Sequence, residues 1–320
     1  MIERQPGAPA IQPWVLDREG RRLQAHDHDR RLSELRAGLL RHPGAHASTA
    51  RASRNELAHT LATLHEPAYL RALASCPSGG PTLMAEFAAP GMAPDTPVCS
   101  EVTVAAFEGV RSAIAAARLI ADGERFTYAL CGPPGHHAGP GWLGGCCYLN
   151  NAAAAAQTLR EAGIGPVGIL DLDIHYPNGT AAIAAHMGDT LLHSLHAWPV
   201  VNVASQTAHP CGERERVVEF DEAPSDASYL EAVAESIEQL ACSAKALVLS
   251  LGYDTVAGDP HGCWSFSPEI FIEIGRLLAA SGLPVCVIQE GGYALDSLAA
   301  SSYAFARGLL GDAENTGGER

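Results

Sequence analysis

The sequence predicts an α/β fold in which helices cover both faces of a central, mainly parallel sheet. Two observations lead to this prediction. The first is that apolar runs of strand length alternate with amphipathic segments of helical period. Strands that alternate with helices form parallel sheets buried on both faces. The chain has 320 residues, of which 47% are hydrophobic, so it can build one large core. We therefore expect residues 1–320 to form a single domain.

The individual elements follow from periodicity and from end signals. Residues 1–30 are rich in charge, Pro and Gly and lack a sustained period, so we expect a surface entry segment there. The predicted helices are Glu101–Asp122, an Ala-rich helix begun by Asn150 or Asn151 and ended by Gly163, Ser228–Ser243, one begun by Ser267 and Pro268, and Ser297–Leu309. The predicted strands are Phe126–Cys131, Val167–Asp171, Ala246–Leu251 and Pro284–Gln289.

The composition excludes several classes of protein. A net charge of −15 with only 21 Lys and Arg argues against a nucleic-acid partner and would favour cationic substrates. No apolar run reaches the roughly 20 residues of a membrane span, so we expect no membrane partner. Residues 1–13 do not resemble a secretory signal, and the nine cysteines, an odd number, suggest reduced thiols; both indicate a cytoplasmic protein. The oligomeric state stays open, a homo-oligomer included.

Polar and charged residues follow each of the four predicted strands. In open α/β sheets, ligands bind beyond the carboxyl ends of the strands. We therefore expect these segments to meet at one edge of the sheet and to form the functional site. The segments are Gly132–His137, Asp171–His175, Gly252–Asp254 and Glu290–Tyr293.

An acidic and imidazole cluster at this edge predicts a metal site. Asp171, Asp173 and His175 alternate, so an extended backbone would point all three side chains to the same side. With Asp254 from a neighbouring strand, Asp173 and His175 can bind one cation and leave a position open, as in catalytic zinc sites. Fe²⁺, Mn²⁺ or Co²⁺ would also suit these ligands. The alternative for an isolated Asp-x-Asp-x-His segment is a turn with hydrogen-bonded carboxylates.

Three further side chains predict acid–base chemistry beside the metal. His136 and His137 follow a rigid Pro-Pro-Gly turn, and imidazoles titrate near neutral pH. Asp171 is left over from a three-ligand site and can orient one of these rings. Tyr293 follows two glycines and can donate its phenol proton to an oxyanion. Taken singly, such a His or Tyr is more often a structural residue.

Taken together, these segments resemble the histone deacetylase superfamily, which includes class II histone deacetylases, bacterial histone-deacetylase-like amidohydrolases and acetylpolyamine amidohydrolases. The resemblance extends from about His26 to Leu310 and implies the arginase-like α/β fold. The matching motifs, in chain order, are Pro133–Ala138, Asp171–His175, Asn178–Thr180, Ser194–His196, Gly252–Asp254, Gly258–Pro260 and Glu290–Tyr293.

The resemblance implies a role for each site residue. Asp173, His175 and Asp254 would bind zinc and a water, and Tyr293 would polarise the acyl carbonyl. His137 would act as general base and then as acid, His136 would give electrostatic support, and the two rings would be oriented by Asp171 and Asn178. Asp95 would bind the substrate at the rim of the tunnel. A structural potassium ion would lie near Asp171, Asp173, His175, Ser194 and Leu195.

The chain departs from its relatives mainly where the substrate would bind. Tyr176 and Pro177 stand where most relatives carry His-Gly after His175, the last residue of the second motif. Gly145 and Cys146 stand at the first aromatic position of the tunnel wall, and Val203 stands near the second, so we expect a wider pocket. His261 occupies the place of an acidic gatekeeper found in polyamine-selective relatives, which argues against a strict polyamine enzyme. Gly252–Thr255, in contrast, resembles bacterial acetylpolyamine amidohydrolases.

These features predict a metal-dependent deacetylase that hydrolyses the amide of a small N-acylated amine, such as an acetylpolyamine or a metabolite. A deacetylase acting on acetyl-lysine in proteins is the second hypothesis. A non-catalytic metal-binding or ligand-binding protein is the third, although it would have no use for an acid, a base and an oxyanion donor together. An arginase-like hydrolase with two manganese ions ranks lowest, because only one ligand set is visible.

Overall fold

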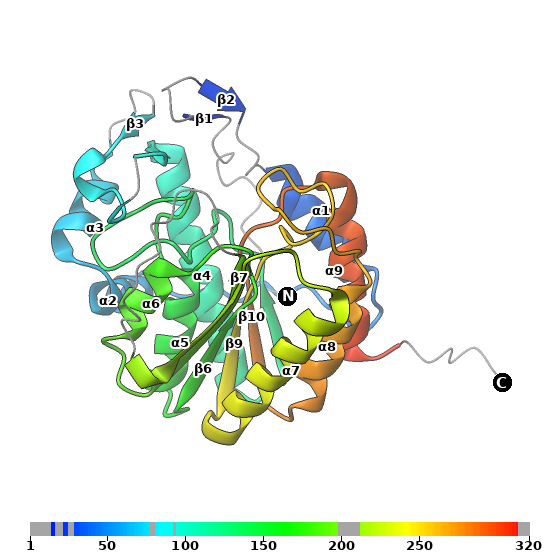
Figure 1. Cartoon of the computed structure of the whole chain (residues 1–320). Coiled ribbons are helices and arrows are strands. Elements are labelled where there is room, and N and C mark those ends of the chain that lie inside the picture. The colour runs from blue at the N-terminus through cyan, green and yellow to red at the C-terminus, as the bar shows by residue number, and fades with distance from the viewer. Residues whose placement is uncertain are drawn as a thin grey trace.

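A six-stranded parallel sheet forms the centre of the protein in the computed structural model, which describes residues 14–16, 22–24, 29–76, 81–91, 94–197 and 212–312. The strand order is β5-β10-β9-β6-β7-β8, and every neighbouring pair is parallel (Figure 1). The strands are β5 (Phe126–Ala129), β6 (Val167–Asp171), β7 (Thr190–Ala197), β8 (Glu215–Phe220), β9 (Ala246–Leu251) and β10 (Val285–Gln289). The predicted α/β class is confirmed.

Helices cover both faces of this sheet (Figure 1). One layer contains α2 (Arg54–Leu64), α3 (Pro67–Ala74), α4 (Ser100–Ala121), α5 (Asn151–Glu161) and α6 (Asn178–Ala184). The other contains α1 (Asp29–Leu40), α7 (Asp226–Ser243), α8 (Ile270–Ala280) and α9 (Leu295–Leu310). Each layer encloses its own buried apolar cluster against the sheet. No helix in the described ranges is long and apolar enough to cross a membrane.

Two small antiparallel pairs lie outside the main sheet. Strands β1 (Trp14–Leu16) and β2 (Arg22–Gln24) pair within the predicted entry segment. Strands β3 (Thr82–Leu83) and β4 (Pro97–Val98) pair just before α4. Short 3-10 helices span Ala85–Phe87 and Gly212–Arg214. That the whole chain forms one domain stays a prediction.

The predicted strands of the sheet centre are found within one or two residues of their expected bounds. The runs at β6, β9 and β10 are buried along their whole length, as expected for strands covered on both faces. Helices α4, α5, α7 and α9 also match their predictions to within two residues, and α8 begins shortly after Ser267 and Pro268. Elements α1 to α3, β7 and β8 were not predicted. In β7, buried polar residues such as His193 and Ser194 interrupt the apolar run.

Candidate active site

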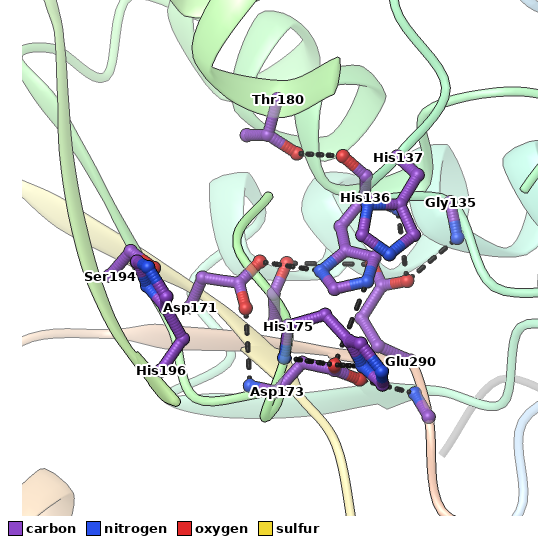
Figure 2. A network of polar contacts seen from close by, with 12 residues as sticks. Gly135, His136, His137, Asp171, Asp173, His175, Thr180, Ser194, His196 and Glu290 are labelled. Atoms are coloured by element: carbon purple, nitrogen blue, oxygen red, sulfur yellow. Dashed lines mark hydrogen bonds and ion pairs between the residues drawn. The ribbon is translucent and has the colours of Figure 1, made fainter. Parts of the chain in front are cut away.

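The four polar segments meet at the carboxyl edge of the sheet, as the strand order requires. Figure 2 shows residues of three of them, His136, Asp173 and Glu290, close together. Asp171 ends β6, and Asp173 and His175 follow it. Asp254 comes three residues after β9, and Glu290 directly follows β10. Because β10, β9 and β6 are adjacent, their carboxyl ends bring residues that are far apart in sequence into contact.

The extended backbone expected for the Asp171–His175 segment is wrong, since the strand ends at Asp171 and the chain then bends. Asp171 Oδ1 accepts the N–H of Asp173 at 3.1 Å, and Asp173 Oδ1 accepts the N–H of His175 at 3.0 Å. These are the hydrogen-bonded turns of the alternative interpretation. These turns nevertheless bring Asp173 and His175 next to Asp254. The hydrogen-bonded turn and the predicted grouping of the three residues are therefore both present.

Asp173, His175 and Asp254 form a group that could hold a metal ion. One ligand atom from each residue lies within 4.8 Å of the others. His175 Nδ1 lies 2.9 Å from Asp173 Oδ1 and 3.3 Å from Asp254 Oδ2. Within the described ranges, Asp254 Oδ2 is buried and receives no well-formed hydrogen bond. A buried carboxylate oxygen without a donor is costly, and a bound cation would compensate for it.

The backbone at Gly252 and Gly291 lies very close to the two carboxylates of this trio. Gly291 N–H donates to Asp173 Oδ2 at 2.8 Å. A Cβ at Gly291 would lie 2.4 Å from Asp254 Oδ2, and one at Gly252 would lie 2.5 Å from Asp173 Oδ2. The glycines are therefore needed for close approach. Two carboxylates and one imidazole match the donor set of catalytic zinc sites and also suit Fe²⁺, Mn²⁺ or Co²⁺.

The electrostatics of the trio also favour a cation. Burial disfavours ionisation of Asp173, yet the neighbouring His136 and His175 hold its pKa well below the usual range. Burial and the charge of Asp173 raise the pKa of Asp254 to about 7. Burial opposes protonation of His175, but hydrogen bonds to both carboxylates raise its pKa to about 10. A proton on His175 thus occupies the place where a metal ion would neutralise the same two carboxylates.

His136 lies against two carboxylates. Its Nδ1 is 3.4 Å from Asp171 Oδ2, and its Nε2 is 3.7 Å from Asp173 Oδ1. Burial opposes protonation, but the charges of Asp173 and Asp171 outweigh it and raise the pKa of His136 to about 10. The two carboxylates therefore favour the protonated form of this ring.

His137 is adjacent to His136, but its surroundings favour the neutral form of the ring. Its Nδ1 lies 2.7 Å from Asn178 Oδ1, and because an amide oxygen can only accept, Nδ1 carries the proton and Nε2 keeps its lone pair. Burial, together with the charges of His136 and His175, holds the pKa of His137 well below the usual range. The two rings lie 4.1 Å apart between centroids. The structure thus pairs a neutral imidazole with a charged one.

Glu290 holds the turn that presents both histidines. Its Oε2 accepts the N–H groups of Gly135 at 2.6 Å and His136 at 3.2 Å, and the Thr180 hydroxyl donates to the carbonyl of His136 at 3.4 Å (Figure 2). The Thr180 N–H also donates to this carbonyl, at 3.0 Å. Burial raises the pKa of Glu290 to about 8. Glu290 begins the predicted Glu290–Tyr293 motif, but no role was predicted for it. Its position directly after a central strand was the signal that could have found it.

Tyr293 is half-buried at the edge of the site and is held from several sides. Its N–H donates to Asp259 Oδ2 at 2.5 Å, and its ring lies edge-on to His261 at 4.6 Å. The guanidinium of Arg31 lies 4.6 Å from the ring centroid. Arg31 is fully buried and donates to Gly292 O at 2.5 Å. Asp259 lies in the predicted Gly258–Pro260 motif, but no role was predicted for it. Arg31 was not predicted, and it precedes all the motifs by about a hundred residues.

Two loops joined by hydrogen bonds carry the residues predicted to bind substrate, which are Asp95, Gly145 and Cys146. Asp95 Oδ1 accepts from Gly145 N at 3.2 Å, and Thr96 Oγ1 accepts from Cys146 N at 2.9 Å. A Cβ at Gly145 would lie 2.4 Å from Cδ2 of His137, so this loop packs directly on the site. The loop therefore lies where a rim would lie, although its binding role stays a prediction.

The remaining predicted site residues are placed less tightly. His261 is exposed beside Tyr293. Val203 lies outside the described residues. Ser194 pairs with Asp171 across β6 and β7, and its Oγ lies 2.8 Å from His196 Nδ1. The potassium site near Ser194 and Leu195 stays a prediction.

The Tyr176–Pro177 departure does not displace His175 from its neighbours. The hydroxyl of Tyr176 donates to Glu215 Oε1 at 2.6 Å, and its ring lies 5.1 Å from that of His196. The turn after His175 is thus anchored to β8 rather than left loose.

A parallel α/β sheet with paired histidines beside an Asp-His-Asp trio that could hold a metal ion defines a class of proteins equipped for acid–base chemistry. Within that class, the chain belongs to the histone deacetylase family, because the profile described as "Histone deacetylase domain" matches residues 26–309. The resemblance predicted from the motifs is confirmed. Family membership implies a hydrolase of the deacetylase type.

Several relatives are named as polyamine enzymes. The acetylpolyamine amidohydrolase of Mycoplana ramosa is 36% identical over 231 residues, which cover 68% of this chain and 67% of that protein. The acetylpolyamine amidohydrolase of Burkholderia pseudomallei (strain 1710b) is 38% identical over 221 residues, covering 67% of this chain and 64% of that protein. The aligned segments thus span about two thirds of these relatives.

Solved structures give the same fold over nearly the whole chain. The crystal structure of acetylpolyamine aminohydrolase from Burkholderia pseudomallei superposes with a TM-score of 0.84 at 29% identity and covers 97% of this chain and 98% of that one. The HDA15 HD domain superposes with a TM-score of 0.77 at 27% identity, covering 93% and 86%.

Proposed function

We propose that the protein is a zinc-dependent amidohydrolase that removes the acetyl or related acyl group from a small N-acylated amine, such as an acetylpolyamine. The observation that carries this proposal is the metal-binding trio beside a neutral His137 and a charged His136. The names of the relatives support an acylated polyamine. The net charge of −15 also favours a cationic substrate.

Asp173, His175 and Asp254 would hold the metal. When bound, zinc would supply Lewis acidity, which lowers the pKa of a water and polarises the acyl carbonyl. Fe²⁺, Mn²⁺ or Co²⁺ could supply the same chemistry from these ligands.

His137 is the proposed general base and acid. The Nδ1–H bond to Asn178 leaves the Nε2 lone pair ready to take a proton from water as its oxygen attacks the acyl carbon. When the C–N bond breaks, Nε2 returns that proton to the leaving amine. The products are a carboxylic acid and a free amine, and His137 is neutral again.

His136 and Tyr293 are the proposed stabilisers of negative charge. His136, kept protonated by Asp171 and Asp173, supplies a fixed positive charge next to the reacting atoms. The Tyr293 phenol would donate a hydrogen bond to the carbonyl oxygen as negative charge develops on it. Asp95, through the loop that includes Cys146, is the proposed contact for the amine portion of the substrate.

Turnover by the zinc-loaded protein tests the proposal on a panel of acetylputrescine, acetylspermidine, acetyl-lysine peptides and bulkier N-acyl amines. We expect preference for an acylated polyamine or another small amine, and loss of turnover in Asp173→Asn and Tyr293→Phe. A protein that accepts only the peptides would instead be a protein deacetylase, an alternative that the similarity to the HDA15 HD domain supports. Stoichiometric zinc without turnover of any panel member would favour a binding protein.

A further inference from the structure

Strand β10 ends in a carboxamide that the proposed chemistry does not use. Gln289 follows four apolar residues, and its side chain is fully buried. Strand β10 lies between β5 and β9 in the sheet. Burying an amide is unfavourable unless its polar atoms are paired. The partners of Gln289 therefore indicate what this side chain does.

Both ends of the carboxamide are paired. Gln289 Nε2 lies 2.9 Å from Gly291 O, 3.1 Å from Glu290 O and 3.3 Å from Leu251 O. Its Oε1 accepts from the hydroxyl of Tyr128 at 2.5 Å. An amide nitrogen has only two protons, so the shortest of these contacts, to Gly291, is the strongest. The side chain links β5, β9 and the turn after β10.

That turn connects the metal-binding trio to the phenol. Gly291 N–H donates to Asp173 Oδ2 at 2.8 Å, while Gly291 C=O accepts from Gln289. Gly292 then takes a φ of 112°, a conformation open mainly to glycine, and Tyr293 follows. Two glycines in succession give a flexible backbone, and rotation of the peptide between them would redirect the Tyr293 side chain.

We propose that Gln289, supported by Tyr128, is a positioning residue that fixes the Gly291–Gly292 peptide and through it the Tyr293 phenol. This inference rests on the proposed function, in which the phenol stabilises negative charge. An apolar side chain of similar size would fill the same space. It would, however, remove one of the two donors to Gly291 O, which also accepts the Tyr253 N–H at 3.0 Å, and would leave the buried Tyr128 hydroxyl without its short acceptor.

The test compares Gln289→Met in the wild-type and Tyr293→Phe backgrounds, using the zinc-loaded full chain and acetylputrescine. In the wild-type background we expect kcat to fall about 10-fold to 100-fold with KM within about 3-fold, as for loss of a transition-state interaction. In the Tyr293→Phe background the further loss should be below about 3-fold, because there is no phenol proton left to position. Tyr128→Phe should show a smaller loss of the same kind.

Val287→Ala is the matched control for lost stability. Val287 is buried in the same strand and lies on the same face as Gln289, but it is separated from the turn. If Val287→Ala lowers the melting temperature as much as Gln289→Met and lowers kcat equally, Gln289 acts only on stability. Equal losses from Gln289→Met with and without the Tyr293 hydroxyl would likewise overturn the proposal.

A crystal structure of Gln289→Met tests the inference without turnover. We expect a displaced Gly291–Gly292 peptide and a shifted Tyr293 ring, and unchanged positions of both would refute the positioning role. If the wild-type protein turns over no acylated amine, the proposed function fails, and this structural comparison still decides whether Gln289 positions Tyr293.

Discussion

Two buried imidazoles, in different regions of the molecule, favour different protonation states. His136, at the carboxyl edge of the sheet, and His65, behind the loop that carries it, are both only 3% exposed. The pKa of His136 is raised to about 10, whereas burial lowers that of His65 to about 4. Burial acts in the same direction on both rings, so the difference must come from their partners.

Those partners are charged in one region and neutral in the other. His136 faces the carboxylates of Asp171 and Asp173. His65 accepts the Asn150 N–H on Nε2 at 3.2 Å, and its Nδ1 therefore carries a proton for Gly139 O at 2.8 Å. The neutral ring of His65 is fully hydrogen-bonded, and a second proton would break the bond from Asn150. His136 and His65 therefore differ in protonation because the neighbours of His136 are charged and those of His65 are neutral.

The largest expected effect comes from removing the negative charge of Asp173 from the proposed metal site. Asp173→Asn keeps the shape of the side chain but deletes a proposed metal ligand and the main negative neighbour of His136. We expect loss of bound zinc and a fall in kcat of more than about 100-fold, the upper range for residues that only support a ligand. Metal analysis and turnover of acetylputrescine measure both. Stoichiometric zinc with near-normal kcat would remove Asp173 from the site.

Replacing the neutral imidazole of the pair should have the next largest effect. His137→Gln removes the proposed base, and the expected fall in kcat is about 10²-fold to 10⁴-fold. His136→Gln serves as the comparison, because it removes a charge but no proton transfer. Equal pH–rate profiles for the two variants would mean that the roles assigned to the two rings are wrong.

Asn178→Asp would make the surroundings of His137 resemble those of His136. A carboxylate 2.7 Å from Nδ1 should raise the pKa of His137, typically by about 1 to 3 units for an adjacent opposite charge. Since the base works when neutral, the acid limb of the kcat/KM profile should move to higher pH and lower the activity at pH 6. Asn178 lies in the first turn of α6, where an Asp is well tolerated. An unchanged acid limb would contradict the assignment of His137 as base.

The smallest effect concerns the stability contributed by the His65 region. Its folded pKa, about 4, is below the ordinary value of 6.5, so the unfolded chain binds the proton more tightly. Stability is then fully present above about pH 6.5 and is lost as pH falls through 4. Between pH 7 and pH 5 this linkage amounts to about 2 kcal/mol. Urea unfolding of His65→Gln should show a pH dependence weaker by that amount, and identical slopes for both proteins would disprove it.

The sequence allowed prediction of the parts of the site that follow the predicted strands of the sheet. Asp173, His175, Asp254 and the two histidines were found in this way, because parallel topology brings strand ends together. Arg31 could not be found, since nothing in α1 marks a contact with Gly292, 261 residues away. Sequence spacing also gave the wrong backbone for Asp173, where side-chain hydrogen bonds bend the chain.

The predicted substrate-binding residues could be placed least well from the sequence. Asp95, Gly145 and Cys146 stand on loops, whose conformation depends on contacts such as that between Thr96 and Cys146, 50 residues apart. One wall position, Val203, lies outside the described residues. Strand β7 was missed for a related reason: His193 and Ser194 are buried polar residues, and only tertiary contacts make them acceptable in a strand.

The backbone of the Gly145–Cys146 loop has a consequence for redesigning the pocket. Cys146 takes a φ of 63°, the left-handed region that a side chain with a Cβ adopts at a cost. In a library of substitutions at Cys146, a variant would first have to tolerate this backbone conformation. Only then would the fit of its side chain to a new acyl group matter. Gly and Asn should be enriched among folded members and β-branched residues depleted. An engineer seeking an aromatic wall there would do better to reshape the loop than to exchange the single residue.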